Sequence, residues 1–155
     1  MPYFQSQVTT AAALANGNAV AALVPAAAVN FKIISLVFGV NNSGGAITDF
    51  DLSVGLNLAT ARGTATTTVT GTRSDPNSAG SAITGMDTAW STQPTLAAAD
   101  ARLWSFNSRG GLALNFNQWD IISTVGTANP LVIVQRSGAG LPASHSITMA
   151  VEWLE

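Results

Sequence analysis

The sequence has no cysteine, and charged residues make up only 9% of its 155 positions. Without cysteine the chain can form neither disulfides nor thiolate metal sites. A typical soluble domain has roughly 25% charged residues, so this chain is expected to present a mostly uncharged surface. Its six cations, Lys32 and five arginines, are scattered and form no basic patch. Because phosphate contacts dominate nucleic-acid affinity, we predict no nucleic-acid partner.

The low charge also bears on association with other protein chains. The formal net charge is -2, which gives a free monomer little electrostatic protection against association. The composition therefore favours a chain that packs against copies of itself or against a partner. The length suits one domain, which at this size buries roughly 70% of its unfolded surface and needs no disulfides to fold.

The sequence also lacks a recognisable targeting or membrane segment. Its N-terminal stretch has neither the basic residues nor the unbroken apolar core of a secretory signal, because an Asn-Gly-Asn turn interrupts it at 16–18. Residues 20–40 have the length of a membrane span. However, such a span would place Pro25 and Lys32 in the hydrocarbon, where polar groups are costly. We therefore predict no membrane partner.

What the sequence does contain is apolar residues with a period of two, the pattern of half-buried strands. Strands are predicted at residues 19–24, 31–40, 47–58, 64–70, 103–106, 112–116, 119–125, 131–134 and 145–153. The turn cluster at 41–45 and the Gly/Pro turn at 137–142 lead us to expect that the strands on either side of each turn form a hairpin. The overall pattern predicts an all-β sandwich or barrel.

The N-terminal residues are interpreted separately from this pattern. Residues 1–17 are predicted to form an extended arm that precedes a single β-sandwich domain at 18–155. Arms of this kind often dock on a neighbouring chain, although a frayed terminus is the commoner outcome. Tyr3 and Phe4, the aromatic residues of the arm, are therefore candidate assembly contacts.

The middle of the chain is interpreted mainly as loop. Residues 71–85 are rich in turn formers, and 96–101 suit a short helix or a wide loop. Trp90 lies in this region, and tryptophan is enriched where interfaces have their strongest contacts. Trp90 is therefore the third candidate assembly contact. Trp153, in contrast, is predicted to be in the core, because it is in phase with the apolar residues of the last strand.

Candidates for chemistry are few. His145 is the only histidine and starts the final strand, where it is more readily explained as a solvated or capped side chain than as a general base. Asp49 and Asp51 would lie on one side of a strand about 7 Å apart, a spacing that suits a calcium ion or a glycosidase pair. Calcium needs six or more oxygens, so we interpret both as solvent-facing acids. We predict no enzyme activity, no cofactor and no metal site.

Two parts of the sequence resemble a known group. These parts are Leu-Val-Pro at 23–25 with the apolar run at 31–38 and its turn, and the chain end at 126–134 and 149–155. They are similar to β-sandwich proteins of tailed-phage virions, among them the jelly-roll capsid decoration, or cement, proteins. The resemblance implies an antiparallel jelly-roll β-sandwich that binds the outside of a phage head as a homotrimer and stabilises the shell. The partners would be further copies and the major capsid protein, and the location the capsid exterior after synthesis in the host cytoplasm.

Two other functions remain open at this point. A receptor- or glycan-binding knob of a head or tail fibre would place one to three exposed Trp or Tyr residues on one loop end. A hydrolase would place His145 within hydrogen-bond reach of a carboxylate and a serine in a pocket.

Overall fold

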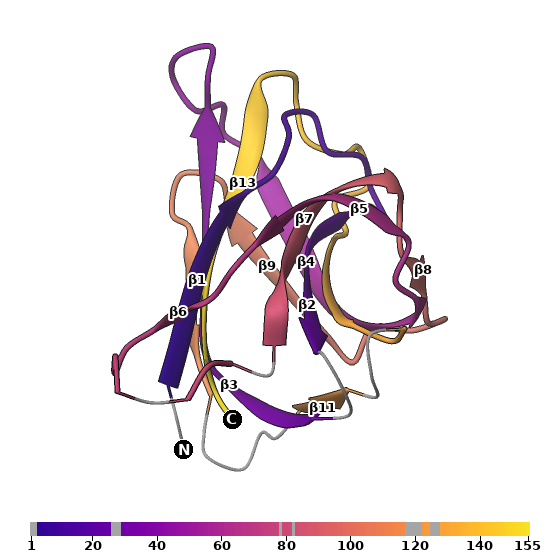
Figure 1. Cartoon of the computed structure of the whole chain (residues 1–155). Coiled ribbons are helices and arrows are strands. Elements are labelled where there is room, and N and C mark those ends of the chain that lie inside the picture. The colour runs from indigo at the N-terminus through magenta and orange to yellow at the C-terminus, as the bar shows by residue number, and fades with distance from the viewer. Residues whose placement is uncertain (1–2, 26–28, 78, 82, 117–121, 125–127) are drawn as a thin grey trace.

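The computed structural model describes residues 3–25, 29–77, 79–81, 83–116, 122–124 and 128–155. Over these ranges the chain forms strands and turns without any helix, and two antiparallel sheets pack against each other as a β-sandwich (Figure 1). This confirms the predicted all-β class. Accordingly, the described ranges hold no helix with the length and apolar character that a membrane crossing requires.

Each sheet combines segments that are distant in the sequence. The first sheet has the order β10 (Leu112–Asn115), β3 (Val29–Asn42), β13 (His145–Leu154), β1 (Tyr3–Thr9) and β6 (Thr72–Arg73), and β11 (Ile122–Thr124) also pairs with β3. The second sheet has the order β5 (Thr64–Val69), β7 (Ile83–Thr92), β2 (Ala19–Pro25), β12 (Leu131–Gln135), β4 (Asp51–Ala61) and β8 (Thr95–Leu96), and β9 (Arg102–Asn107) also pairs with β4. The rest of the strand predicted at 119–125 lies outside the described residues.

The pairing is nested along the chain. β1 pairs with β13, β2 with β12, β3 with β10 and β4 with β9. β3 and β4 therefore lie in different sheets, as do β12 and β13. Both predicted hairpins are wrong, because the turns between these strands carry the chain from one sheet to the other. Turn chemistry identifies a reversal of the chain, but not whether the next strand pairs with the one before it.

The inner faces of the two sheets form the main core. His145, Ile147, Met149, Val151 and Trp153 are all buried, so the predicted period of the last strand is confirmed. The indole ring of Trp153 stacks on Phe4 with 5.7 Å between ring centroids. The two residues lie opposite each other on β1 and β13, and both belong to the core cluster.

The predicted N-terminal arm is the main correction. Residues 3–9 form β1, which lies between β13 and β6 inside the first sheet, so the sandwich begins before residue 18. Phe4 is fully buried and cannot be an assembly contact. The prediction missed the strand because its alternation has Ser6 at an inward position, between Phe4 and Val8. Pairing with β13 stabilises a segment whose own apolar pattern is weak.

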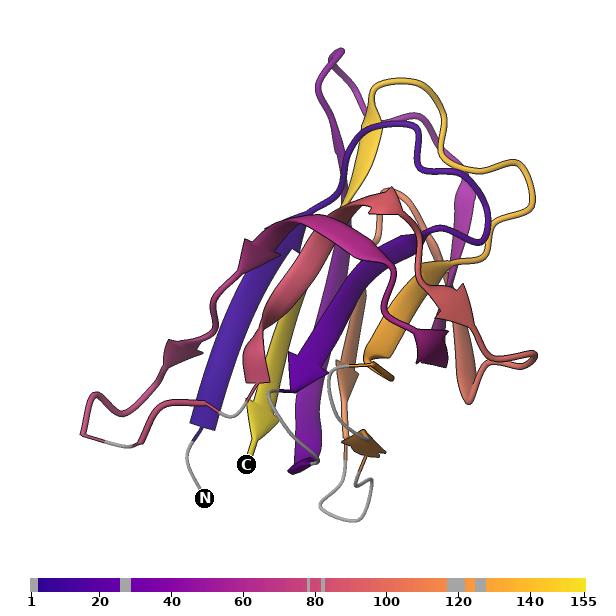
Figure 2. The same ribbon diagram turned by 45° about the vertical axis from the view of Figure 1, so that its right-hand side comes forward.

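The middle of the chain is a second correction. Residues 83–92, expected to be partly loop, form β7, and the chain from β5 to β6 passes from the second sheet to the first (Figure 2). The segment between β4 and β9 contributes to a second apolar cluster on the outer side of the second sheet. In this cluster Trp90 and Leu96 pack on small residues such as Ala22 and Ala59. β2 is buried along its whole length as a result.

Candidate functional site

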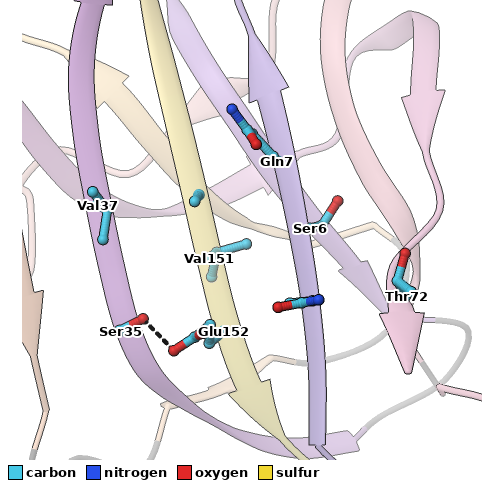
Figure 3. Close-up of a pocket in the computed structure, with 9 residues that line it drawn as sticks. Ser6, Gln7, Ser35, Val37, Thr72, Val151 and Glu152 are labelled. Atoms are coloured by element: carbon cyan, nitrogen blue, oxygen red, sulfur yellow. Dashed lines mark hydrogen bonds between the residues drawn. The ribbon is translucent and has the colours of Figure 1, made fainter. Parts of the chain in front are cut away.

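The outer face of the first sheet carries a shallow trough with a volume of about 310 Å³ (Figure 3). It runs across β1, β13 and β3, and β6 contributes at one side. It is lined by Gln5, Ser6, Gln7, Ser35, Val37, Thr72, Ala150, Val151 and Glu152. Most of these side chains are polar, and Glu152 is the one ionisable group among them. The trough therefore combines hydroxyl, amide and carboxylate groups with a small apolar surface.

Strand register explains why these residues meet. Gln7 lies opposite Ala150, which in turn lies opposite Val37, so one row crosses the three central strands. In the next row Gln5 lies opposite Glu152, which lies opposite Ser35. Because side chains alternate between the two faces of a strand, both rows point outward. The methyl group of Ala150 between longer neighbours makes the middle of the face low.

Glu152 is held in place by two hydroxyl groups. Ser35 Oγ donates a hydrogen bond of 2.7 Å to its Oε2 atom, and this bond and a second one from the Tyr3 hydroxyl lower the pKa of Glu152 below its ordinary value. The hydrogen bond between Tyr3 and Glu152 raises the pKa of Tyr3 to about 12, because it stabilises the protonated hydroxyl as a donor. Glu152 is therefore an ionised, oriented hydrogen-bond acceptor at neutral pH.

Few other charges lie near the trough. Apart from His145, the strands that line the trough, β1, β3, β6 and β13, contain three side chains with a charge at neutral pH: Lys32, Arg73 and Glu152. Lys32 lies opposite Leu154, one row beyond Glu152. The side chain of Val37 is 45% exposed on this face. The face as a whole is polar and close to neutral.

His145 lies away from the trough and connects loops. Its side chain is buried, its Nε2 atom accepts a 3.0 Å hydrogen bond from the backbone N–H of Thr48, and its Nδ1 atom lies 3.0 Å from the carbonyl oxygen of Ala143. These contacts assign the proton to Nδ1. Phe50 packs edge-on against the ring. The hydrolase hypothesis expected a carboxylate and a serine at this imidazole. Both ring nitrogens instead face backbone groups, so general base chemistry would require Thr48 to be released.

The remaining predicted residues are placed as follows. Tyr3 is half-buried on the outer face of the first sheet, and Trp90 is half-buried over the second apolar cluster. Asp49 and Asp51 are exposed, and Asp49 accepts a hydrogen bond from Asn107. Among the residues that the structure describes, no three His, Asp or Glu side chains lie close enough together to hold a metal ion.

A second hollow, of about 270 Å³, lies beside Trp90 and the alanine-rich loop at 11–15. The Nε1 atom of Trp90 is buried, and the described part of the chain provides no hydrogen-bond partner for it. The tryptophans do not form a platform at one loop end: Trp153 is buried, and Trp90 and Trp104 are half-buried on separate strands, while Trp119 lies outside the described residues.

Sequence reasoning missed two surface features. The first is the trough, of which only the outward placement of Ala150 and Glu152 on the last strand could be anticipated. The second is Leu103, whose side chain is 60% exposed on β9. Among the described strands β9 pairs only with β4, so no described strand lies along its other edge. Leu103 was predicted to be an ordinary strand residue, and its outward phase on a short strand gave little signal.

Neither the protein-family models, nor the curated proteins, nor the solved structures with which the chain was compared match it.

Proposed function

We propose that the chain is a structural virion protein, a capsid decoration protein that binds the outside of a tailed-phage head as a homotrimer and stabilises the shell. The observation that carries this proposal is a mostly uncharged exterior with a strand, β9, that exposes Leu103 and has no described strand along its outer edge.

The strand order supports a jelly roll as the scaffold. Eight strands pair first with last, from β1–β13 inward to β4–β9, which is the arrangement of one long hairpin. The further pairs β13–β3 and β12–β4 roll that hairpin into two sheets. Double-sheet jelly rolls of eight strands are common among viral capsid proteins. Of the other strands, β5 to β8 are an insertion between the innermost pair, β4 and β9, and β11 lies between β10 and β12 in the chain.

The surface supports a protein that works in contact with others. Exposed strand edges are usually protected by charges, proline or a cover, because an open edge pairs readily with another chain. β9 has Arg102 at its start, but its exposed centre presents Leu103 and Ser105. An edge of this kind suits a permanent contact with another copy or with a capsid subunit. Each docked copy binds only the assembled shell, so it adds its binding free energy to the stability of that shell.

The experiment measures assembly and shell binding separately. Sedimentation analysis of the purified chain should show a compact trimer, and expanded capsid shells of its own phage should take it up to a fixed, saturating number of copies. Replacing Leu103 by Glu should weaken assembly or shell binding about tenfold or more, as expected for a residue at the centre of an interface. Thr66→Glu, which introduces the same acidic side chain on the exposed strand β5, is the control. A wild-type monomer that does not bind shells would contradict the proposal.

A further inference from the structure

We propose that the trough on the first sheet is a binding site for a neutral saccharide unit. The proposal does not depend on the capsid role, because it uses the outer face of β1, β13 and β3 rather than the β9 edge. It rests on the kinds of polar group that the trough brings together, on the way Glu152 is oriented, and on the small apolar surface between the polar groups.

The polar groups match vicinal hydroxyls. A sugar hydroxyl both donates and accepts a hydrogen bond, so a site for it needs both kinds of group close together. Gln5 and Gln7 supply amide donors and acceptors two residues apart on one strand face, and both side chains are exposed. Glu152 supplies a charged acceptor in the row of Gln5. Hydrogen bonds to an ionised acceptor are about twice as strong as neutral ones, so Glu152 is the expected anchor.

The anchor is pre-organised. A hydrogen bond from Ser35, drawn as a dashed line in Figure 3, orients the Glu152 carboxylate before any ligand arrives. The Tyr3 hydroxyl also acts as a donor to this carboxylate. Less side-chain freedom is then lost on binding. The two hydroxyls also use part of the carboxylate's acceptor capacity, which leaves less for the paired contact that a guanidinium makes. A cationic ligand would in addition leave the amide N–H donors of Gln5 and Gln7 unmatched, since a cation offers only donors.

The apolar part of the trough suits the C–H face of a sugar ring. Val37 and Ala150 lie in the same row, opposite Gln7. Val37 stands as an exposed side wall, and Ala150 is the low floor. A volume of about 310 Å³ is at the lower end of the range of small-ligand pockets, roughly 300–1,000 Å³, so the site accommodates one or two rings. Because the site is shallow, we expect a dissociation constant of about 1 mM.

The test is a nuclear magnetic resonance titration of the whole chain, observing backbone amides. The probes are glucose, galactose, mannose and N-acetylglucosamine, with their β-linked disaccharides. At least one should shift the amides of Gln5, Gln7, Val37 and Ala150 in a saturable way. Glu152→Gln should weaken this binding about tenfold, because it replaces a charged acceptor by a neutral one. Ala150→Leu should abolish binding by filling the floor.

The matched control is Asp51→Asn, which removes one exposed carboxylate from the second sheet and should leave the titration unchanged. Far-ultraviolet circular dichroism of each variant checks the fold. The proposal is overturned if none of the saccharides shifts these amides, or if Asp51→Asn weakens binding as much as Glu152→Gln. It is also overturned if the cationic probe arginine amide gives the only saturable response, or if the same amides shift with protein concentration alone, which would assign the trough to a second copy. The saccharide titration does not depend on whether sedimentation shows a trimer. The saccharide proposal and the capsid proposal can therefore fail separately.

Discussion

Asn57 should be one of the most sensitive positions for stability outside the apolar core. It is fully buried on β4, and its Nδ2 atom donates to the carbonyl oxygens of Ala97 and Ala99 and to Asp100 Oδ1, at 3.2, 3.1 and 2.8 Å. Its Oδ1 atom accepts from the backbone N–H of Ala97 at 2.9 Å. One amide therefore supplies four of the hydrogen bonds that hold the 97–101 segment against the second sheet.

The loss of stability in Asn57→Ala depends on which hydrogen bonds each partner of Asn57 retains. The Ala97 N–H retains Leu58 O as an acceptor, and Asp100 retains its ion pair with Arg136. The carbonyl groups of Ala97 and Ala99 lose a donor, and because Ala99 is exposed and Ala97 half-buried we expect water to replace it only in part. A lost hydrogen bond in such positions costs about 0.5–1.5 kcal/mol, and a group left buried costs about 1–3 kcal/mol. We therefore expect a loss of about 2–4 kcal/mol, which lowers the melting temperature by roughly 5–15 °C in a domain of this size.

Urea unfolding at pH 7 measures the loss, and the dependence on urea should stay the same because the unfolded surface is the same. Asn57→Asp separates geometry from hydrogen bonding. It keeps the shape but turns an acceptor towards the two carbonyls and Asp100, so it should be worse than Asn57→Ala at pH 7 and recover as acid protonates the new carboxyl. A loss below about 1 kcal/mol for Asn57→Ala, or equal effects of the two variants, would refute the reasoning.

Two further variants test other contacts by the same unfolding measurement. A Cβ at Gly71 would lie 2.5 Å from the buried ring of Trp153, so Gly71→Ala should cost about 1–3 kcal/mol, whereas Gly138→Ala, with open space around it, should cost less than about 1 kcal/mol. A hydrogen bond from Arg136 lowers the pKa of Asp100 below its ordinary value of 3.8, so the pair's contribution is present above that pH and is lost as pH falls further. Asp100→Asn should thus be less stable than wild type at pH 7, and the difference should disappear in strong acid. A difference that stays constant across this pH range would contradict the assignment.

Local sequence pattern was sufficient for most strands, because burial on one face imposes a period of two. The last strand shows this most clearly: every inward residue from His145 to Trp153 is buried. The pattern failed where something other than apolar alternation stabilises the strand. β1 has Ser6 on its inner face and depends on β13, and β7 depends on Asp87, which is buried with Arg62 and Thr68 as its partners. In the sequence alone, an aspartate such as Asp87 indicates a turn, because nothing local shows that an arginine elsewhere in the chain will pair with it in the core.

Strand pairing is a different kind of information from strand location. In a nested arrangement β1 meets β13 across almost the whole chain, and no local signal in either strand specifies the other. The two predicted hairpins illustrate the limit. Their turns have the Gly, Asn and Pro residues of reversals, yet each joins two sheets, because β3 and β12 already have both neighbours supplied by distant segments. Turn residues thus determine where the chain reverses. Which strand the next segment pairs with depends on strands that are distant in the sequence.

The trough depends on this long-range information more than any other part of the molecule. The outward phase of β13 places Ala150 and Glu152 on one face, and that much follows from the sequence. Glu152 becomes an oriented acceptor only because the register with β3 puts Ser35 opposite it and the register with β1 puts Gln5 on its other side. A one-residue slip of either strand would turn the polar row inward and the core outward. The buried Phe4, Trp153 and Val151 prevent that slip, so the core that sets the register also assembles the polar site on the opposite face.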